Sequence, residues 1–373
     1  MNHLFMKMAL DLAIKAKGRT SPNPMVGAVV VCLEKVIGTG YHKQAGTEHA
    51  EIIAIQSAGK QTFGATLYVN LEPCCHYGKT GPCTEAIIQS GIQKVVLAME
   101  DPNPLVAGKG TQQLKKAGIE VVTDVLQEEA RQINEVYIKY IQTQLPFVVL
   151  KTAMSLDGKI ATSSGDSQWI TGKASRAYAH QLRDTYDAVL VGVNTVLTDD
   201  PRLTVRIPGH IGKNPVRVVL DSQLRIPLTS SIVQNACNLK TIVATTTNAN
   251  QHKMDLLLDH GVDLCLAGEG PKVDISCLLK KLVCEHSITS VLVEGGAEVN
   301  ASFLSAGVVD KIYWMLAPIM MGSHESKGPI ASMGIDKVDQ AFRFRVSTLR
   351  QLNGDILVEG YPMKAIKTPC LLE

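Results

Sequence analysis

The sequence PCCHYGKTGPC occupies residues 73–83, and the tripeptide His49-Ala50-Glu51 opens a predicted helix about one supersecondary unit upstream. Together the two segments offer one imidazole, two thiolates and a carboxylate close to the imidazole. Catalytic zinc in proteins has three protein ligands and keeps its fourth tetrahedral position for water. We therefore expect His49, Cys74 and Cys83 to bind Zn²⁺. Glu51 is expected to be the catalytic carboxylate that moves protons.

The spacing of the cysteines differs from that of the usual zinc-deaminase motif. A His-x-Glu tripeptide followed by Pro-Cys-x-x-Cys is the signature of zinc deaminases that act on cytosine or adenine. Here Cys83 lies nine residues after Cys74, and Cys75 is a possible ligand in place of Cys74. The polar, glycine- and proline-rich loop between them carries His76 and Lys79, which indicates a substrate that is larger than a base and bears a phosphate. A structural zinc site is the alternative, but such sites usually have four protein ligands.

Composition limits the class of protein. A chain of 373 residues with 45% hydrophobic residues is long enough for two domains with separate cores. The net charge of +2, the 5% aromatic content and the lack of a basic run argue against a nucleic-acid partner. The nine cysteines are scattered and odd in number, and neither a signal peptide nor an apolar run of about 18 residues is present. We expect a cytoplasmic protein without a membrane partner.

The hydrophobic pattern predicts an α/β protein throughout. Helical and strand patterns alternate up to residue 142, which predicts a three-layer domain with a mixed sheet. The segment Gln144-Leu145-Pro146 interrupts the pattern, so we place the domain boundary near residue 145. Helices are predicted over 5–16, 48–58, 84–90, 110–117 and 128–142, and strands over 26–33, 39–42, 65–71, 94–99 and 120–123. Beyond the boundary, strands are predicted over 147–151, 188–193, 216–220, 241–245, 290–293 and 311–316, with a final hairpin over 342–349 and 355–361.

A glycine pair follows one of the buried strands in the second domain. Glu294-Gly295-Gly296 comes directly after the strand 290–293 and opens a predicted helix. Such a turn lets backbone N–H groups approach a diphosphate, which the helix dipole attracts. Alone it is a weak signal, because an ordinary tight turn has the same sequence. No G-x-G-x-x-G follows a strand, so a Rossmann domain is not supported.

The motifs together resemble one known family. His-Ala-Glu with PCCHYGKTGPC is similar to the deaminase domain of the bifunctional riboflavin-biosynthesis deaminase/reductases, within the cytidine-deaminase-like superfamily. The segments KTAMSLDGKIA (151–161), GVNTVLTDDPRLTVR (192–206) and EGG (294–296) resemble, in the same order, the reductase half of that family. The resemblance covers nearly the whole chain. It implies a zinc-dependent pyrimidine deaminase domain over 1–145 and an NADPH-dependent reductase domain with a dihydrofolate-reductase-like fold over 146–373.

The resemblance also implies roles for individual residues. In the first domain the predicted substrate contacts are Asn23, His76 and Lys79. In the second domain the positions that match the cofactor site are Ala153, Trp169, Thr195, Asp199, Ser222 and Gly296. The positions that match the sugar-phosphate site are Ser167, Arg183, Leu203, Arg206 and Glu294. Two arginines suit a phosphate because each forms charge-assisted, often bidentate, hydrogen bonds. For Trp169 a role in the hydrophobic core is the alternative.

The implied function has two steps. The first domain is expected to deaminate 2,5-diamino-6-(5-phosphoribosylamino)pyrimidin-4(3H)-one by hydrolysis. The second is expected to reduce 5-amino-6-(5-phosphoribosylamino)uracil with NADPH, which converts the ribosyl unit into a ribityl chain. We expect a homo-oligomer that acts on small molecules. Two alternatives remain at this point: a nucleotide-binding protein with structural zinc, and a deaminase whose second domain has lost activity.

Overall fold

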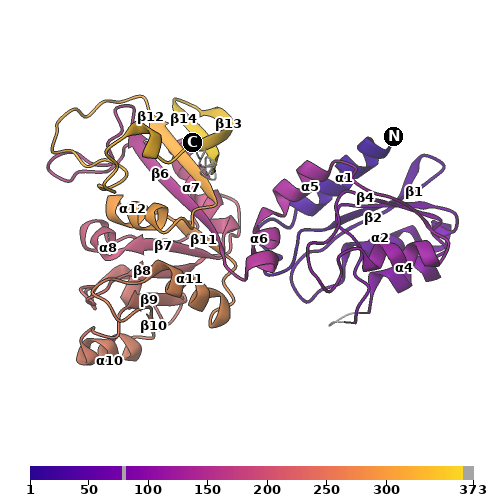
Figure 1. Cartoon of the computed structure of the whole chain (residues 1–373), viewed down its shortest axis with the longest axis horizontal. Helices are drawn as coiled ribbons and strands as arrows, with labels where there is room; N and C mark the ends of the chain where they lie inside the picture. Colours follow the sequence, from indigo (N-terminus) through magenta and orange to yellow (C-terminus); the bar gives the residue numbers. More distant parts are fainter. Residues whose placement is uncertain (78–80, 364–373) are drawn as a thin grey trace, which may run out of the picture. The chain divides into compact units, whose positions relative to one another are not determined.

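The computed structural model describes residues 1–77 and 81–363, and it divides the chain into two compact units, Met1–Leu145 and Pro146–Glu373 (Figure 1). Both units contain a sheet covered by helices, which confirms the predicted α/β class. Among the described residues no helix is both long and apolar enough to cross a membrane.

The first unit is a five-stranded sheet between two helical layers. The strand order is β2-β1-β3-β4-β5, in which β1 is antiparallel to β2 and β3 while β3, β4 and β5 are parallel. Its helices and strands are α1 (Asn2–Ile14), β1 (Gly27–Cys32), β2 (Lys35–Tyr41), α2 (Ala50–Ala58), the short helix η1 (Gly59–Thr62), β3 (Thr66–Val69), α3 (Cys83–Gln89), β4 (Lys94–Leu97), α4 (Lys109–Lys116), β5 (Glu120–Val122), α5 (Gln127–Ile133) and α6 (Glu135–Thr143).

The burial of strand β1 shows why the first unit has helices on both faces of its sheet. Successive side chains of a strand point to opposite faces, and every residue from Gly27 to Val31 is buried. Val29 and Val31 pack in the core beneath α1, α5 and α6. Ala28 and Val30 pack in the second core with residues of α2, α3 and α4. The predicted three-layer arrangement is therefore confirmed.

Two details of the first unit differ from the prediction. The single helix expected over 128–142 is broken at Asn134, whose φ of −103° and ψ of 17° are not helical. The Asn134 side chain accepts a hydrogen bond from Met25 N and donates one to Met25 O, so it ties the break to a distant segment. Strand β2 begins earlier than expected because Leu33 and Glu34 form a tight turn with φ values of 47° and 62°. Neither residue is a usual turn former, so the sequence carries no sign of this turn.

The second unit is a nine-stranded sheet with the order β10-β9-β8-β7-β11-β6-β12-β14-β13. The strands from β10 to β12 in this order are parallel, and β14 is antiparallel to its neighbours β12 and β13. Its elements are β6 (Phe147–Ser155), α7 (Lys173–Thr185), β7 (Ala188–Gly192), α8 (Val193–Asp199), β8 (Val216–Leu220), α9 (Ser231–Gln234), β9 (Thr241–Thr245), α10 (Gln251–Asp259), β10 (Asp263–Leu266), α11 (Ile275–Cys284), β11 (Ser290–Val293), α12 (Ala297–Ser305), β12 (Lys311–Ala317), η2 (Val338–Gln340), β13 (Phe344–Leu352) and β14 (Asp355–Pro362).

The central strands of this sheet are continuous apolar runs, as expected for parallel strands that are covered on both faces. Val189, Val219 and Val243, from β7, β8 and β9, share one core with residues of α8, α9 and α10. Strand β10 is absent from the prediction. It has only four residues at the edge of the sheet, and just one of them, Cys265, is fully buried. Its hydrophobic pattern is therefore too short and too weak to stand out in the sequence.

Candidate active sites

A cavity of about 490 Å³ opens in the first unit beside the carboxyl ends of β3 and β4. In sheets of this kind, ligands bind where the parallel strands end. Four groups of residues form the wall: the loop before β1, the segment from His42 to Glu51, the loops that follow β3 and β4, and helix α6. The predicted residues that line it are Asn23, His49, Glu51, Cys74 and His76. Lys79 lies outside the described residues.

The three predicted zinc ligands lie together. His49 is the N-cap of α2, Cys74 lies in the loop after β3, and Cys83 is the first residue of α3. The Nδ1 atom of His49 is 3.1 Å from Cys83 Sγ and 3.5 Å from Cys74 Sγ, and the three ligand atoms all lie within 4.8 Å of one another. One nitrogen and two sulfur donors at this spacing suit a tetrahedral zinc ion with one position left for water. Cys75 is not part of this cluster.

Cys74 favours the thiolate form, which is the form that binds a metal cation. A hydrogen bond from the Cys83 thiol and the nearby His49 ring lower the pKa of Cys74 to about 4, while the same hydrogen bond raises the pKa of Cys83. Metal binding requires thiolates. Glu51 lies in the first turn of α2 and is only 4% exposed. Burial raises the pKa of Glu51 to about 7, as expected for a carboxyl group that both takes up and releases a proton at neutral pH.

Asn23 forms part of a polar chain that reaches the metal cluster. Its Nδ2 lies 3.2 Å from His42 Nε2, and the other ring nitrogen of His42 is 3.1 Å from the Glu48 carbonyl oxygen. The His42 ring packs edge-on against His49, with ring centroids 5.7 Å apart. The Asn23 amide therefore meets a buried histidine on the cavity wall.

Two further carboxylates, Asp101 and Glu72, shape this cavity, and neither is among the predicted site residues. Asp101 Oδ1 accepts hydrogen bonds from Tyr137 Oη at 2.8 Å and from Asn103 N at 2.9 Å. The buried Glu72 accepts backbone N–H bonds from Asp101, Gly108 and Thr111, at 3.3, 2.9 and 2.8 Å. Glu72 therefore ties the loop after β4 to the metal-binding loop. The only feature of the sequence that places Glu72 near the site is its position directly before Pro73-Cys74.

A second cavity, of about 1370 Å³, lies in the second unit along the carboxyl ends of β6, β11, β7 and β8. It brings together nearly all the predicted residues of this unit. Those on its wall are Ala153, Ser167, Trp169, Arg183, Thr195, Asp199, Arg206, Ser222, Glu294 and Gly296. Leu203 is the exception, because its side chain is 3% exposed and packs in the core beneath β7 and β8. Only the backbone of Leu203 is left for the predicted contact.

Glu294 is the centre of a largely buried ion cluster in this cavity. Its carboxylate accepts two hydrogen bonds from Arg183, at 2.7 and 2.9 Å, and lies 3.4 Å from Lys151 Nζ. Burial alone would raise the pKa of Glu294, but Arg183 and Lys151 lower it to about 2. Two of the Arg183 nitrogens are therefore engaged by Glu294, which differs from the expectation that both arginines are free for a phosphate.

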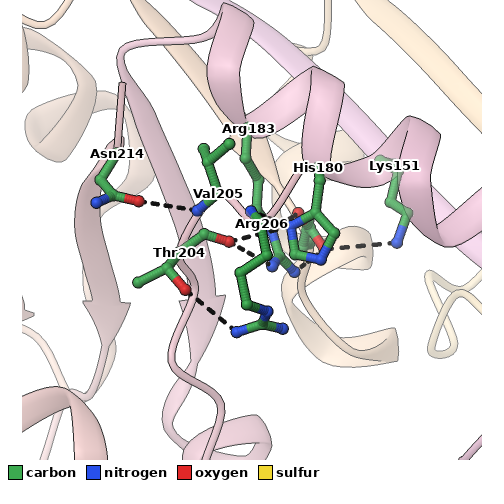
Figure 2. A network of polar contacts seen from close by, with 8 residues as sticks. Lys151, His180, Arg183, Thr204, Val205, Arg206 and Asn214 are labelled. Atoms are coloured by element: carbon green, nitrogen blue, oxygen red, sulfur yellow. Dashed lines mark hydrogen bonds and ion pairs between the residues drawn. The ribbon is translucent and has the colours of Figure 1, made fainter. Parts of the chain in front are cut away.

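Arg206 is the more accessible of the two predicted arginines. Figure 2 shows Arg206, His180 and Arg183 grouped around Thr204. Arg183 donates to the Thr204 carbonyl oxygen, while Arg206 donates through one guanidinium nitrogen to Thr204 Oγ1. His180 Nδ1 lies 3.1 Å from the Thr204 carbonyl oxygen and 3.3 Å from Arg206 N, so this histidine contacts the backbone that carries the arginine. Neither His180 nor Lys151 is among the predicted site residues, although Lys151 begins the segment 151–161 that resembles the reductase family.

Replacing Glu294 by Gln is expected to destabilise the second unit by about 3 kcal/mol at pH 7, because it leaves two largely buried cations without their counter-ion. The pKa of Glu294 is depressed from 4.5 to about 2, so its contribution to stability is present above pH 4.5 and is lost as the pH falls toward 2. Urea unfolding at a series of pH values should thus show the largest difference near neutral pH and a narrowing below pH 4.5. The exposed Glu325→Gln variant serves as the control. A difference independent of pH would contradict the ion cluster.

Comparison with known proteins decides the family. Residues 1–99 match the family described as the cytidine and deoxycytidylate deaminase zinc-binding region, and residues 146–358 match the RibD C-terminal domain. The chain is 44% identical over 356 residues to the riboflavin biosynthesis protein RibD of Actinobacillus pleuropneumoniae, covering 95% of this chain and 94% of that protein. It is 47% identical to RibD of Aquifex aeolicus, covering 95% and 96%. The chain belongs to the RibD family.

Solved structures support the same family assignment. One structure of Acinetobacter baumannii RibD superimposes with a TM-score of 0.88 at 38% identity, covering 97% of this chain and 99% of that one. A deaminase/reductase from Thermotoga maritima gives a TM-score of 0.85 at 39% identity, covering 97% and 99%. As a RibD-family protein, the chain is a bifunctional deaminase and reductase of riboflavin biosynthesis, with zinc and NADPH as cofactors.

The large cavity of this RibD-family chain fits a dinucleotide. Gly296 is the N-cap of α12 and lines the cavity, and a Cβ atom at Gly296 would meet nothing within 4 Å, so its backbone is open to a ligand. A Cβ atom at Gly295 would instead lie 2.5 Å from Val299, so that glycine is required by packing. Trp169 is 68% exposed with the Arg176 guanidinium 4.6 Å above its ring, which excludes the core role considered for it.

Proposed function

We propose that the unit Met1–Leu145 carries the deaminase and the unit Pro146–Glu373 the reductase. The substrate of the first is proposed to be 2,5-diamino-6-(5-phosphoribosylamino)pyrimidin-4(3H)-one, and that of the second 5-amino-6-(5-phosphoribosylamino)uracil. The similar protein from Thermotoga maritima is named a diaminohydroxyphosphoribosylaminopyrimidine deaminase/5-amino-6-(5-phosphoribosylamino)uracil reductase. The observation that carries the proposal is the His49, Cys74 and Cys83 cluster next to the buried Glu51.

In the deaminase, His49, Cys74 and Cys83 are proposed to hold zinc. Bound zinc lowers the pKa of a water molecule toward neutrality, so that hydroxide is available for attack. Glu51 is proposed to take the proton from that water and to deliver protons to the ring nitrogen and the departing amino group. Its burial and its pKa of about 7 suit both directions of transfer.

The rest of the deaminase cavity is proposed to bind the substrate. Asn23 and His76 lie on its wall, and we keep Lys79 as a proposed contact with the ribosyl phosphate. Asp101 also faces this cavity. Because its Oδ1 already accepts two hydrogen bonds, Oδ2 is the oxygen that is available for an amino group of the pyrimidine.

In the reductase, NADPH supplies the hydride and the protein supplies position and charge. The cofactor contacts are proposed to be Ala153, Trp169, Thr195, Asp199, Ser222 and Gly296. The sugar-phosphate contacts are proposed to be Ser167, Arg183, Arg206, Glu294 and the backbone of Leu203. Lys151 lies beside Glu294 on the same wall, and we propose that its ammonium group donates a hydrogen bond to the ribosyl oxygen on which charge develops.

Cellular setting and assembly complete the proposal. A cytoplasmic location is proposed because zinc binding needs Cys74 and Cys83 as reduced thiols, and reducing compartments maintain them. A homo-oligomer is proposed on the resemblance alone.

A two-step assay tests the proposed function. The full-length protein, loaded with zinc, is mixed with the diaminopyrimidine substrate, and ammonia release is followed. NADPH is then added, and its oxidation is measured by absorbance together with the ribityl product. Both signals are expected, with the second dependent on the first. Ammonia release without NADPH oxidation would indicate an inactive second unit. The absence of both signals would reject the proposal.

A further inference from the structure

The large cavity of the second unit has two cations at the end formed by β8. Arg225 follows β8 in the chain, and Lys272 lies in the loop between β10 and α11. Both side chains are exposed on the cavity wall, and neither forms an ion pair with any residue in 1–77 or 81–363. Nothing in the proposed function uses either residue.

The turn that carries Arg225 is held firmly enough to fix its position. Leu224 has a φ of 53°, unusual for a residue with a branched side chain, and that side chain is buried in the core. Asp221 stabilises the turn with two hydrogen bonds. Its carbonyl oxygen accepts a hydrogen bond from Leu224 N at 3.2 Å, and its Oδ2 accepts one from Ile226 N at 2.7 Å. With its neighbours anchored on both sides, Arg225 is directed to the surface of the cavity.

A hydrogen bond to Asn194 also restrains the guanidinium group of Arg225. One of its terminal nitrogens donates to Asn194 Oδ1 at 2.9 Å, and Asn194 precedes the proposed cofactor contact Thr195. An arginine has five N–H donors, so most of the donors of Arg225 stay available for a ligand. Lys272 is brought to the same region because Ser222 Oγ accepts a hydrogen bond from Val273 N at 3.0 Å. Ser222 is itself a proposed cofactor contact.

Other cations of the cavity are committed elsewhere. Arg183 and Lys151 neutralise Glu294, while Arg176 covers the Trp169 ring and donates to a backbone carbonyl. Arg183 and Lys151 meet at Glu294, which follows β11, and Arg176 lies against the loop that carries Trp169 and Thr171.

Arg206 and Lys327 do not belong to the carboxyl end of β8 either, since Val205 N donates to Asn214, which precedes the start of β8. Arg206 belongs to the group around Thr204 and His180, and the Lys327 carbonyl oxygen accepts from Ile160 N, beyond the end of β6. At the β8 end the uncommitted positive charge is therefore that of Arg225 and Lys272.

A buried acceptor in the same place indicates a hydroxyl-bearing ligand. Asp221 is 1% exposed and belongs to the cavity wall, yet its Oδ1 has no hydrogen-bond partner among the described residues. A buried carboxylate oxygen without a donor is costly, so a donor from a ligand would stabilise it. A ribose hydroxyl is such a donor, and a carboxylate that follows a strand is a common partner for it.

We propose that Arg225, assisted by Lys272, binds the 2′-phosphate of the adenosine ribose and so makes the reductase prefer NADPH over NADH. This phosphate is the only chemical difference between the two cofactors, and arginine is the side chain that binds it most effectively. Asp221 receives the remaining ribose hydroxyl. The inference rests on the placement of NADPH in this cavity under the proposed function.

The test compares Arg225→Gln and Lys272→Gln in the full-length protein, with the exposed Lys280→Gln, outside the cavity, as the matched control. For Arg225→Gln, kcat/KM with NADPH is expected to fall about 10–100-fold, while that with NADH changes less than about threefold. Lys272→Gln should give a smaller loss with the same selectivity, because a flexible exposed ammonium forms weaker contacts. Lys280→Gln should leave both values unchanged.

Calorimetry without NADPH gives a second readout. Adenosine 2′,5′-bisphosphate is expected to bind Arg225→Gln more weakly than the wild type by the same factor, and adenosine 5′-monophosphate equally well to both. Equal losses with NADPH and NADH, or an unchanged preference in Arg225→Gln, would overturn this inference alone. A wild-type protein that oxidises neither cofactor would overturn the proposed reductase and this inference with it.

Discussion

Replacing Glu51 by Gln is expected to lower the rate of ammonia release by about 10²–10⁴-fold, the contribution typical of a positioned general acid–base group. Glutamine keeps the size of the side chain and its ability to accept a hydrogen bond, but it does not take up or deliver a proton in this pH range. Glu51 is not one of the three clustered metal ligands, so zinc content should stay the same. Ammonia release under single-turnover conditions and metal analysis of the purified variant give the two measurements.

The bifunctional chain provides its own controls for this variant. NADPH oxidation with the deaminated intermediate should be unchanged, because Glu51 and the second cavity belong to different compact units. Glu48→Gln makes the same chemical change three residues away, at an exposed position outside the deaminase cavity, and should deaminate normally. A Glu51→Gln variant that retains zinc and releases ammonia at the wild-type rate would remove Glu51 from the mechanism.

The proximity of His49, Cys74 and Cys83 could be predicted from the sequence because their positions depend on local structure. His49 and Glu51 flank the start of one helix, Cys83 begins another, and Cys74 ends the connection from a buried strand. Strong hydrophobic patterns placed all of these elements within a few residues. Since the ends of parallel strands gather at one edge of a sheet, side chains at those ends had to converge.

Local hydrophobic patterns do not predict contacts between segments that are distant in the sequence. Nothing in the sequence shows that Glu294 pairs with Arg183, 111 residues away, or that Leu203 turns its side chain into the core. The break at Asn134 has the same origin, since its partner Met25 is 109 residues distant. In each case the local sequence allows several structures, and a tertiary hydrogen bond or packing contact selects one.

Cys74 and Cys75 offer a direct test of the ligand assignment, because the two residues are adjacent and chemically identical. Cys74→Ala is expected to weaken zinc binding by more than about 100-fold, since even changes around a metal ligand commonly cost 10–100-fold. Deamination should be lost with the metal. Cys75→Ala is expected to keep zinc and deaminate at nearly the wild-type rate, because Cys75 lies outside the cluster.

Metal content after dialysis against a chelator, with ammonia release on the same samples, distinguishes the two variants. NADPH oxidation with the deaminated intermediate should persist in both, which shows that any loss is confined to the first unit. The opposite result, with zinc lost in Cys75→Ala and kept in Cys74→Ala, would assign the ligand to Cys75. That exchange would require the loop after β3 to turn by one residue. Cys74 Sγ would then give up the hydrogen bond that it accepts from Cys83 N at 3.4 Å. Since this bond and the approach to His49 both favour Cys74, we expect the exchange not to occur.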